Sequence, residues 1–153
     1  MDGRDQTDAM AFVSITRLRI RSVRFMPGFA VHTLRSLHQV RRAEGLLGGS
    51  LLADARLVFW TMTIWTDQAA MRRYMTNGAH LKAMPYLLHW CDEASIVHWT
   101  TDDIATPSWQ EADRRMRGEG RPSKVRHPSA DHQALRFAPP RPRTGGPIRP
   151  VRP

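Results

Sequence analysis

The chain has 153 residues, which is enough for one domain with a modest hydrophobic core, and its formal net charge is +9. Its single cysteine excludes an internal disulfide, and no His, Cys, Asp or Glu residues have the spacing of a metal site. No apolar run approaches the roughly 18 residues of a membrane span, and the polar N-terminus carries no secretion signal. We therefore expect a cytoplasmic protein with no membrane partner.

The positive charge is concentrated near the C-terminal end. Residues 117–153 hold nine Lys/Arg, two acidic residues and eight of the eleven prolines, whereas residues 1–116 hold 14 basic and 12 acidic residues. A segment rich in Pro and Arg without apolar periodicity buries little surface, so we predict a disordered basic tail over 117–153. Residues 1–9 are polar and are predicted to form a disordered arm. The folded domain is then 10–116.

Apolar periodicity predicts four strands and two helical regions in this domain. The strands are expected over 11–21, 45–54, 57–65 and 94–99. The first helix begins at Pro27, and the second helical region follows a capping residue, Asp67, and is broken at Asn77-Gly78. The order β-α-β-β-α-β predicts an α+β, ferredoxin-like fold, which is an antiparallel sheet with helices on one face. A short amphipathic helix is expected over 108–116.

The strand over 57–65 is apolar on both of its faces. Its even positions are Val58, Trp60, Met62 and Ile64, and we expect them to pack under the helices. Its odd positions include Phe59, Thr61, Thr63 and Trp65, whereas an antiparallel sheet with one face in water alternates apolar with polar residues. We therefore predict that a second copy of the chain covers the odd face, which gives a homodimer in the form of a dimeric α+β barrel.

The barrel interior is predicted to bind a small hydrophobic molecule, because it is mostly apolar with a few placed hydroxyl groups. The expected substrate-binding residues are Phe59, Thr61, Thr63, Trp65 and Trp99. A filled dimer core without a ligand is the alternative. His80 follows the helix break at once and is the catalytic candidate, as an acid, a base or an iron ligand. A purely structural role for His80 as a cap of the next helix is the alternative.

The stretch IWTDQAAMRRYMTNGAH resembles the strand-to-helix region of antibiotic-biosynthesis-monooxygenase-like members of the dimeric α+β barrel superfamily. These members show a Trp, an acidic cap, an apolar helix face and a histidine, which correspond here to Trp65, Asp67, Ala70, Met71, Tyr74 and His80. Residues 60–120 are similar to an uncharacterised domain family related to spheroidene monooxygenases, through Trp65, Gly78, His80, Met84, Trp90 and the run Val97-His98-Trp99. The resemblance implies the barrel fold and leaves the reaction open, because superfamily members include cofactor-free and haem-binding enzymes.

Three functions therefore stay open. The first is a monooxygenase-like oxidoreductase that needs no cofactor and oxidises a small hydrophobic or aromatic substrate, with His80 as its acid or base. The second is a haem protein with His80 as the iron ligand, although haem-degrading relatives place that ligand near the position of Met84. The third is a non-catalytic dimeric module whose basic tail recruits an acidic partner. Nucleic acid is not expected, because the tail has one aromatic residue, Phe137, for base stacking.

Overall fold

A six-stranded antiparallel sheet forms the centre of the computed structural model, which describes residues 10–141 and 144–151. The strand order is β5-β4-β1-β3-β2-β6. The strands are β1 (Ala11–Ile20), β2 (Leu46–Ala53), β3 (Val58–Trp65), β4 (Cys91–Thr101), β5 (Arg121–Pro122) and β6 (Thr144–Ile148). The helices are a 3-10 turn (Val23–Phe25), α1 (Met26–Arg41), α2 (Gln68–Met75), α3 (Gly78–Trp90) and α4 (Trp109–Glu119). The predicted α+β, ferredoxin-like architecture is confirmed.

Local sequence signals account for the helix ends. The Asp67 carboxylate accepts a hydrogen bond from the Ala70 amide at 2.8 Å, which caps α2. Ser108 caps α4 in the same way through the Glu111 amide at 3.1 Å. The break between α2 and α3 falls at Gly78, whose φ of 59° lies in the left-handed region. The second helical region is therefore two helices, and α3 begins two residues before His80.

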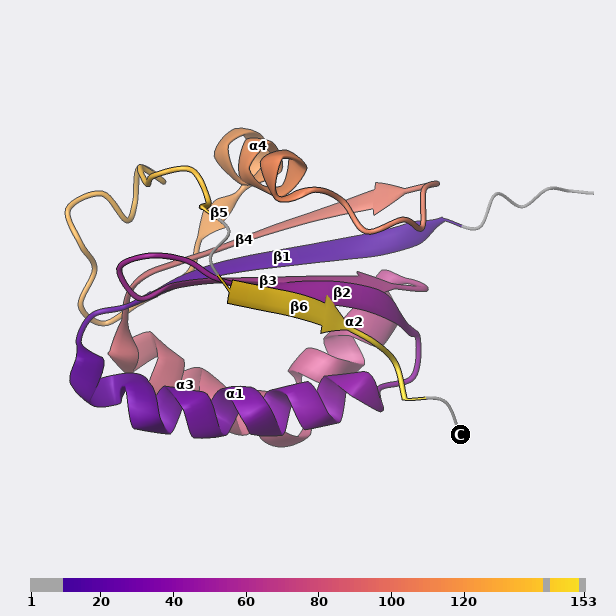
Figure 1. The fold of residues 1–153 in the computed structure, drawn as a ribbon, viewed down its shortest axis with the longest axis horizontal. Coiled ribbons are helices and arrows are strands. Elements are labelled where there is room, and N and C mark those ends of the chain that lie inside the picture. Colours follow the sequence, from indigo (N-terminus) through magenta and orange to yellow (C-terminus); the bar gives the residue numbers. More distant parts are fainter. Residues whose placement is uncertain (1–9, 142–143, 152–153) are drawn as a thin grey trace, which may run out of the picture.

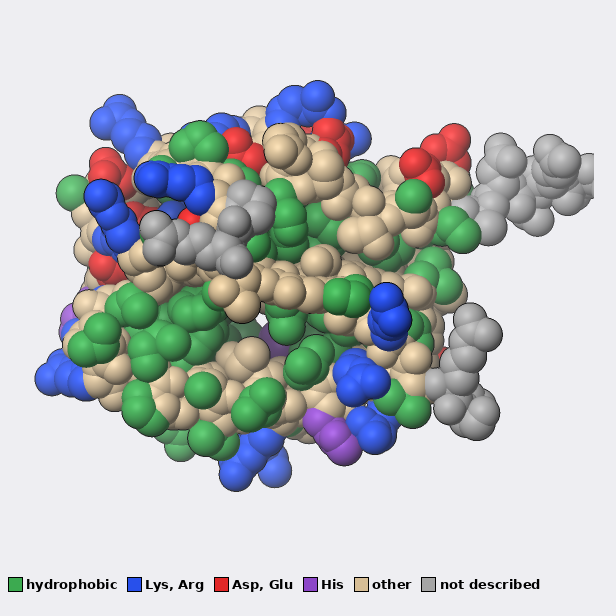
Figure 2. All heavy atoms as spheres, viewed as in Figure 1, with side chains coloured by type: hydrophobic (Ala, Val, Ile, Leu, Met, Phe, Trp, Pro, Cys, Tyr) green, Lys and Arg blue, Asp and Glu red, His purple; other side chains and the backbone are tan. Residues whose placement is uncertain are grey.

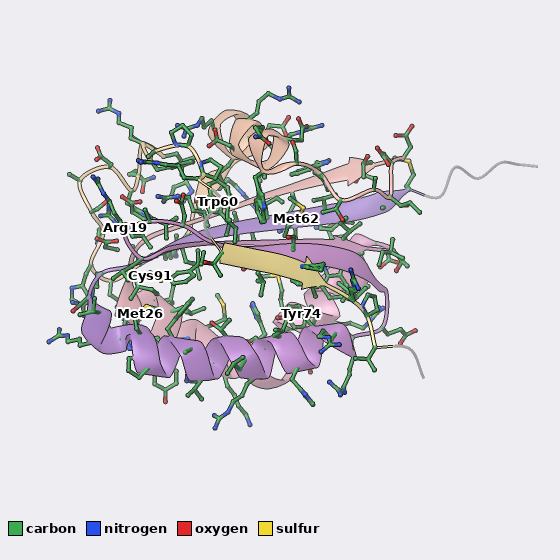
Figure 3. The ribbon with its side chains drawn as sticks, viewed as in Figure 1. Arg19, Met26, Trp60, Met62, Tyr74 and Cys91 are labelled. Atoms are coloured by element: carbon green, nitrogen blue, oxygen red, sulfur yellow. The ribbon has the colours of Figure 1, made fainter. Side chains whose placement is uncertain are left out.

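Helices cover both faces of the sheet, whereas the sequence predicts helices on one face only (Figure 1). Helices α1, α2 and α3 lie on one face, and α4 lies on the other, over β4 and β1. We call these the helix face and the α4 face. Figure 3 shows the labelled Trp60 and Met62 on the α4 side of the sheet and Tyr74 on the other side.

The α4 face is a filled hydrophobic core. Ala112 and Met116 of α4 pack there against Val13, Ile15, Trp60, Met62, Ile64 and Val97. The prediction that the even positions of β3 pack under the first helices was therefore wrong. Side-chain alternation shows which residues share a face, but it does not show which layer covers that face. Because α4 covers this face from within the chain, it accounts for a strand that is apolar on both sides without a second copy, and the homodimer stays a prediction.

The chain after Met116 also packs on the sheet, in the region where the sequence predicts no regular structure. Strand β6 pairs with β2 along its edge, and Ile148 is 2% exposed. The Phe137 ring lies 5.8 Å from the Trp60 ring and under the Arg17 guanidinium at 4.3 Å. These residues are buried because segments far apart in the sequence pair with each other. Periodicity within one segment does not show such pairing.

A buried ion pair fixes the same segment to the α4 face. Arg17 Nη1 donates to Glu93 Oε2 at 2.7 Å, and the two side chains are 5% and 6% exposed. The Ser129 hydroxyl donates to the other Glu93 oxygen at 2.9 Å. The pair therefore connects β1 and β4 to the chain that follows β5.

The predicted arm over 1–9 lies outside the described residues, and the domain limits of 10–116 and 117–153 stay predictions. Among the helices of residues 10–141 and 144–151, none combines the length and the apolar character needed to cross a membrane.

Candidate ligand-binding cavity

A cavity of about 330 Å³ lies between the helix face of the sheet and the helices α1 and α3. Figure 2 shows a hollow between β6 and α1, with histidine visible inside it. The volume falls within the range of roughly 300–1,000 Å³ that small-molecule sites occupy. Residues of one chain line the cavity, and its enclosure by two copies stays a prediction.

The cavity wall is apolar apart from hydroxyl groups and the two histidines His32 and His80. Ser14 and Thr16 of β1 lie opposite Thr63 and Thr61 of β3, and all four residues line the cavity. Further hydroxyl groups come from Thr33 and Ser36 on α1, and the remaining wall is largely Leu, Met, Phe and Ala. No Lys, Arg, Asp or Glu lines the cavity within the described part of the chain. Because an unpaired charge is costly to bury, this lining favours a neutral ligand.

Three aromatic rings contact one another in sequence at the cavity wall. The Trp65 and Tyr74 rings are stacked with centroids 5.4 Å apart, and the His80 ring is tilted by 54° against Tyr74 at 4.9 Å. Trp65 Nε1 donates to the Thr63 hydroxyl at 2.8 Å, which fixes one of the cavity's hydroxyl groups. Burial raises the pKa of the Tyr74 phenol above its usual value, so this group remains protonated.

His80 is held by contacts to α1 and α2. Its backbone amide donates to the Gln39 side-chain oxygen at 2.9 Å, and the Gln39 amide group donates to the Asn77 carbonyl at 2.8 Å. The His80 Nδ1 atom lies 3.1 Å from the Met75 carbonyl oxygen. A carbonyl oxygen only accepts, so this contact assigns the proton of the neutral ring to Nδ1. Nε2 is then left with a lone pair, and it has no hydrogen-bond partner among the described residues.

The surroundings of His80 favour its neutral form. Burial lowers the pKa of the imidazole, and the hydrogen bond to the Met75 carbonyl opposes that shift in part. A neutral imidazole with a free Nε2 lone pair can accept a proton or a hydrogen bond from a bound molecule. The arrangement therefore provides a base at the cavity wall, where His32 is a second lining imidazole and no described Lys, Arg, Asp or Glu is present.

The structure brings most of the predicted site residues together. His80, Phe59, Thr61 and Thr63 line the cavity, and Trp65 lies behind the wall against Tyr74. Trp99 is the exception, because it lies on the α4 face with the Arg115 guanidinium 4.9 Å from its ring centre.

The cavity residues of α1 and β6 were not predicted from the sequence. On α1 these include Thr33, Ser36 and Leu37, and their spacing of three and four residues on one helix face was a usable signal. On β6 they are Thr144, Gly145 and Ile148, and the sequence around them has no strand periodicity.

A haem with His80 as its iron ligand does not fit this lining. Haem carries two carboxylate groups, and no cationic side chain among the described residues lines the cavity to pair with them. No group of three or more His, Cys, Asp and Glu residues in the described ranges is arranged to hold a metal ion.

The fold is similar to that of solved structures that include putative antibiotic biosynthesis monooxygenases. A putative antibiotic biosynthesis monooxygenase from Nitrosomonas europaea is 14% identical with a TM-score of 0.51, over 60% of this chain and 89% of that one. Another from Bacteriodes thetaiotaomicron VPI-5482 is 15% identical with a TM-score of 0.52, over 60% and 89% of the two chains. A conserved protein from Methanosarcina mazei Go1 is 11% identical with a TM-score of 0.53, over 60% and 93%. At these identities the likeness concerns the fold alone.

The chain belongs to the family described as a domain of unknown function (DUF3291), which matches residues 5–121. None of the curated proteins matches the sequence.

Proposed function

We propose that the protein is a monooxygenase-like enzyme that oxidises a small, neutral, hydrophobic or aromatic molecule in the cavity between the sheet and α1–α3. The observation that carries this proposal is the uncharged cavity of about 330 Å³ with the neutral His80 at its wall. The fold supports it, because structures of the same fold include putative antibiotic biosynthesis monooxygenases.

In the proposed reaction His80 Nε2 takes a proton from an acidified methylene group of the substrate. The Met75 carbonyl, 3.1 Å from Nδ1, then stabilises the positive imidazolium through the Nδ1 hydrogen bond. The resulting carbanion is electron-rich and gives electrons to O₂. The methylene becomes a carbonyl with one oxygen atom, and the other oxygen atom leaves as water with the two methylene hydrogens. The substrate supplies all the electrons, so no further reductant is required.

Binding is tested by thermal unfolding with two probes of the same ring system, 1-naphthol and 1-naphthoate. A neutral ligand at 100 times its Kd adds about 2.7 kcal/mol to the stability of the folded state, which for a chain of this size is roughly 5–10 °C in Tm. We expect a shift of this size with saturating naphthol and none with naphthoate, because no Lys or Arg among the described residues lines the cavity. No shift with naphthol, or an equal shift with both, contradicts the proposal.

Turnover is tested by O₂ uptake with anthrone, whose methylene lies between two aromatic rings. Removing a general base costs about 10²–10⁴-fold in rate, so we expect a loss of that order in His80→Asn. Lys82→Ala, a change at an exposed position of the same helix, is the matched control. If both variants oxidise anthrone at the wild-type rate, His80 is not the base. If the wild type binds the probe but takes up no O₂ beyond the buffer blank, the oxidation step is overturned.

A further inference from the structure

We infer that β6 is the specificity element of the cavity and determines which ligands it retains. This inference rests on the proposed function, because it concerns the molecules that the same cavity binds. Strand β6 lies beyond residue 121, where the match to the family ends. The wall that it supplies therefore lies outside the residues that the family model matches.

Three of the five residues of β6 line the cavity. They are Thr144, Gly145 and Ile148. Pairing of β6 with β2 runs from Thr144 opposite Ala53 to Ile148 opposite Gly49, so the strand extends the sheet at the side that α1 spans. The hollow in Figure 2 lies directly between β6 and α1, which places this strand at the mouth of the cavity.

Strand β6 is attached to α1 as well as to the sheet. Ile148 packs in the same buried cluster as Val40 of α1. The Arg41 guanidinium donates to the Arg149 carbonyl at 3.1 Å, and the Val151 amide donates to the Arg41 carbonyl at 2.8 Å. The strand and the residues that follow it therefore bridge the sheet edge and the helix, and they close the side of the cavity between them.

Of the two neighbouring glycines in β6, only Gly145 is required for the pairing of β6 with β2. A Cβ atom on Gly145 would lie 2.1 Å from the Leu51 carbonyl oxygen, a backbone atom of β2 that cannot move aside cheaply. A Cβ atom on Gly146 would meet nothing within 4 Å. A strand glycine often marks such a close approach of two backbones. Alanine at 145 should therefore separate β6 from β2, whereas alanine at 146 should leave the pairing unchanged.

The two glycines provide a matched pair of variants. We would measure the dissociation rate of 1-naphthol from the full chain by stopped-flow fluorescence, together with deuterium uptake of residues 144–151. For Gly145→Ala we expect at least a tenfold faster dissociation and faster deuterium uptake in this segment alone. For Gly146→Ala both values should stay within twofold of the wild type. A folded Gly145→Ala protein that releases the probe at the wild-type rate overturns the inference.

Ile148→Ala keeps the inference testable if Gly145→Ala does not fold. Removing the buried Ile148 side chain enlarges the cavity at the β6 wall, so we expect the affinity for a three-ring phenol relative to 1-naphthol to rise at least fivefold. An unchanged ratio contradicts a role of β6 in selection. A wild-type protein that binds neither phenol contradicts the proposed function and this inference together, whereas binding that is insensitive to all β6 variants contradicts this inference alone.

Discussion

The two faces of the sheet share the same strands but have different contents. On the α4 face, Met62 and Met116 are fully buried in a filled core, and a buried ion pair joins Arg17 to Glu93. On the helix face, Thr61 and the helices α1 and α3 enclose about 330 Å³ of empty space without a charged side chain among the described lining residues. Apolar strand faces alone therefore do not distinguish a core from a binding site. The feature that distinguishes the helix face is its cross-strand patch of Ser and Thr hydroxyls.

The largest expected effect of a substitution is on the α4 face. Glu93→Gln leaves the Arg17 guanidinium buried without its carboxylate, and losing one partner of a buried pair costs about 3–5 kcal/mol. The measurement is the free energy of unfolding in urea. The exposed pair on α4 provides the control, because Arg114→Gln breaks a solvated contact to Glu111 and should cost about 0–1 kcal/mol. Equal costs for the two changes would contradict the view of the α4 face as a tightly buried layer.

The same enlargement of an alanine should have opposite consequences on the two faces. Ala112→Leu inserts a larger side chain into the filled core and should destabilise the protein by about 1–3 kcal/mol. Ala83→Leu points the added atoms at the cavity, so we expect little loss of stability and at least a tenfold loss of affinity for 1-naphthol. Urea unfolding and a fluorescence titration measure the two quantities. A destabilisation by Ala83→Leu as large as that by Ala112→Leu would show that the cavity is not open space.

A smaller effect is expected from the protonation of His80. Burial holds its pKa below the ordinary value, so the unfolded chain binds this proton more readily than the folded protein as the pH falls below about 6.5. Stability should therefore fall with decreasing pH in this range, and His80→Asn should lose that part of the dependence. The measurement is the difference in unfolding free energy between the two proteins from pH 7 to pH 5. Burial also lowers the pKa of His98. His98 is present in both proteins, so its contribution cancels in the difference between their unfolding free energies. A constant difference would contradict the burial of His80.

Local signals in the sequence were sufficient for the order of the ferredoxin-like strands and helices. The Asp67 cap and the break at Asn77-Gly78 fixed the second helical region, and they placed His80 at the start of α3. The alternation within β3 grouped Phe59, Thr61 and Thr63 on one face, where they now line the cavity.

The covering layers and the strand register could not be predicted in the same way. Trp99 lies opposite Val13, which lies opposite Ile64, and this register places the Trp99 ring on the α4 face. Register is set by contacts between distant strands, which alternation within one strand does not contain. Strand β6 escaped prediction for a similar reason, because its glycines and proline act through contacts with β2 and α1.

Methionine methyl groups provide the most direct test of the account, because they lie on both faces of the sheet. Met71, Met75 and Met84 line the cavity, whereas Met62 and Met116 are buried on the α4 face. The measurement is a titration of protein labelled with ¹³C at the methionine methyls, with 1-naphthol as the ligand and NMR chemical shifts as the readout. We predict that the first three methyl signals shift together and saturate, while those of Met62 and Met116 stay in place. Shifts confined to Met62 and Met116, or no saturable shift at all, would contradict a ligand site on the helix face.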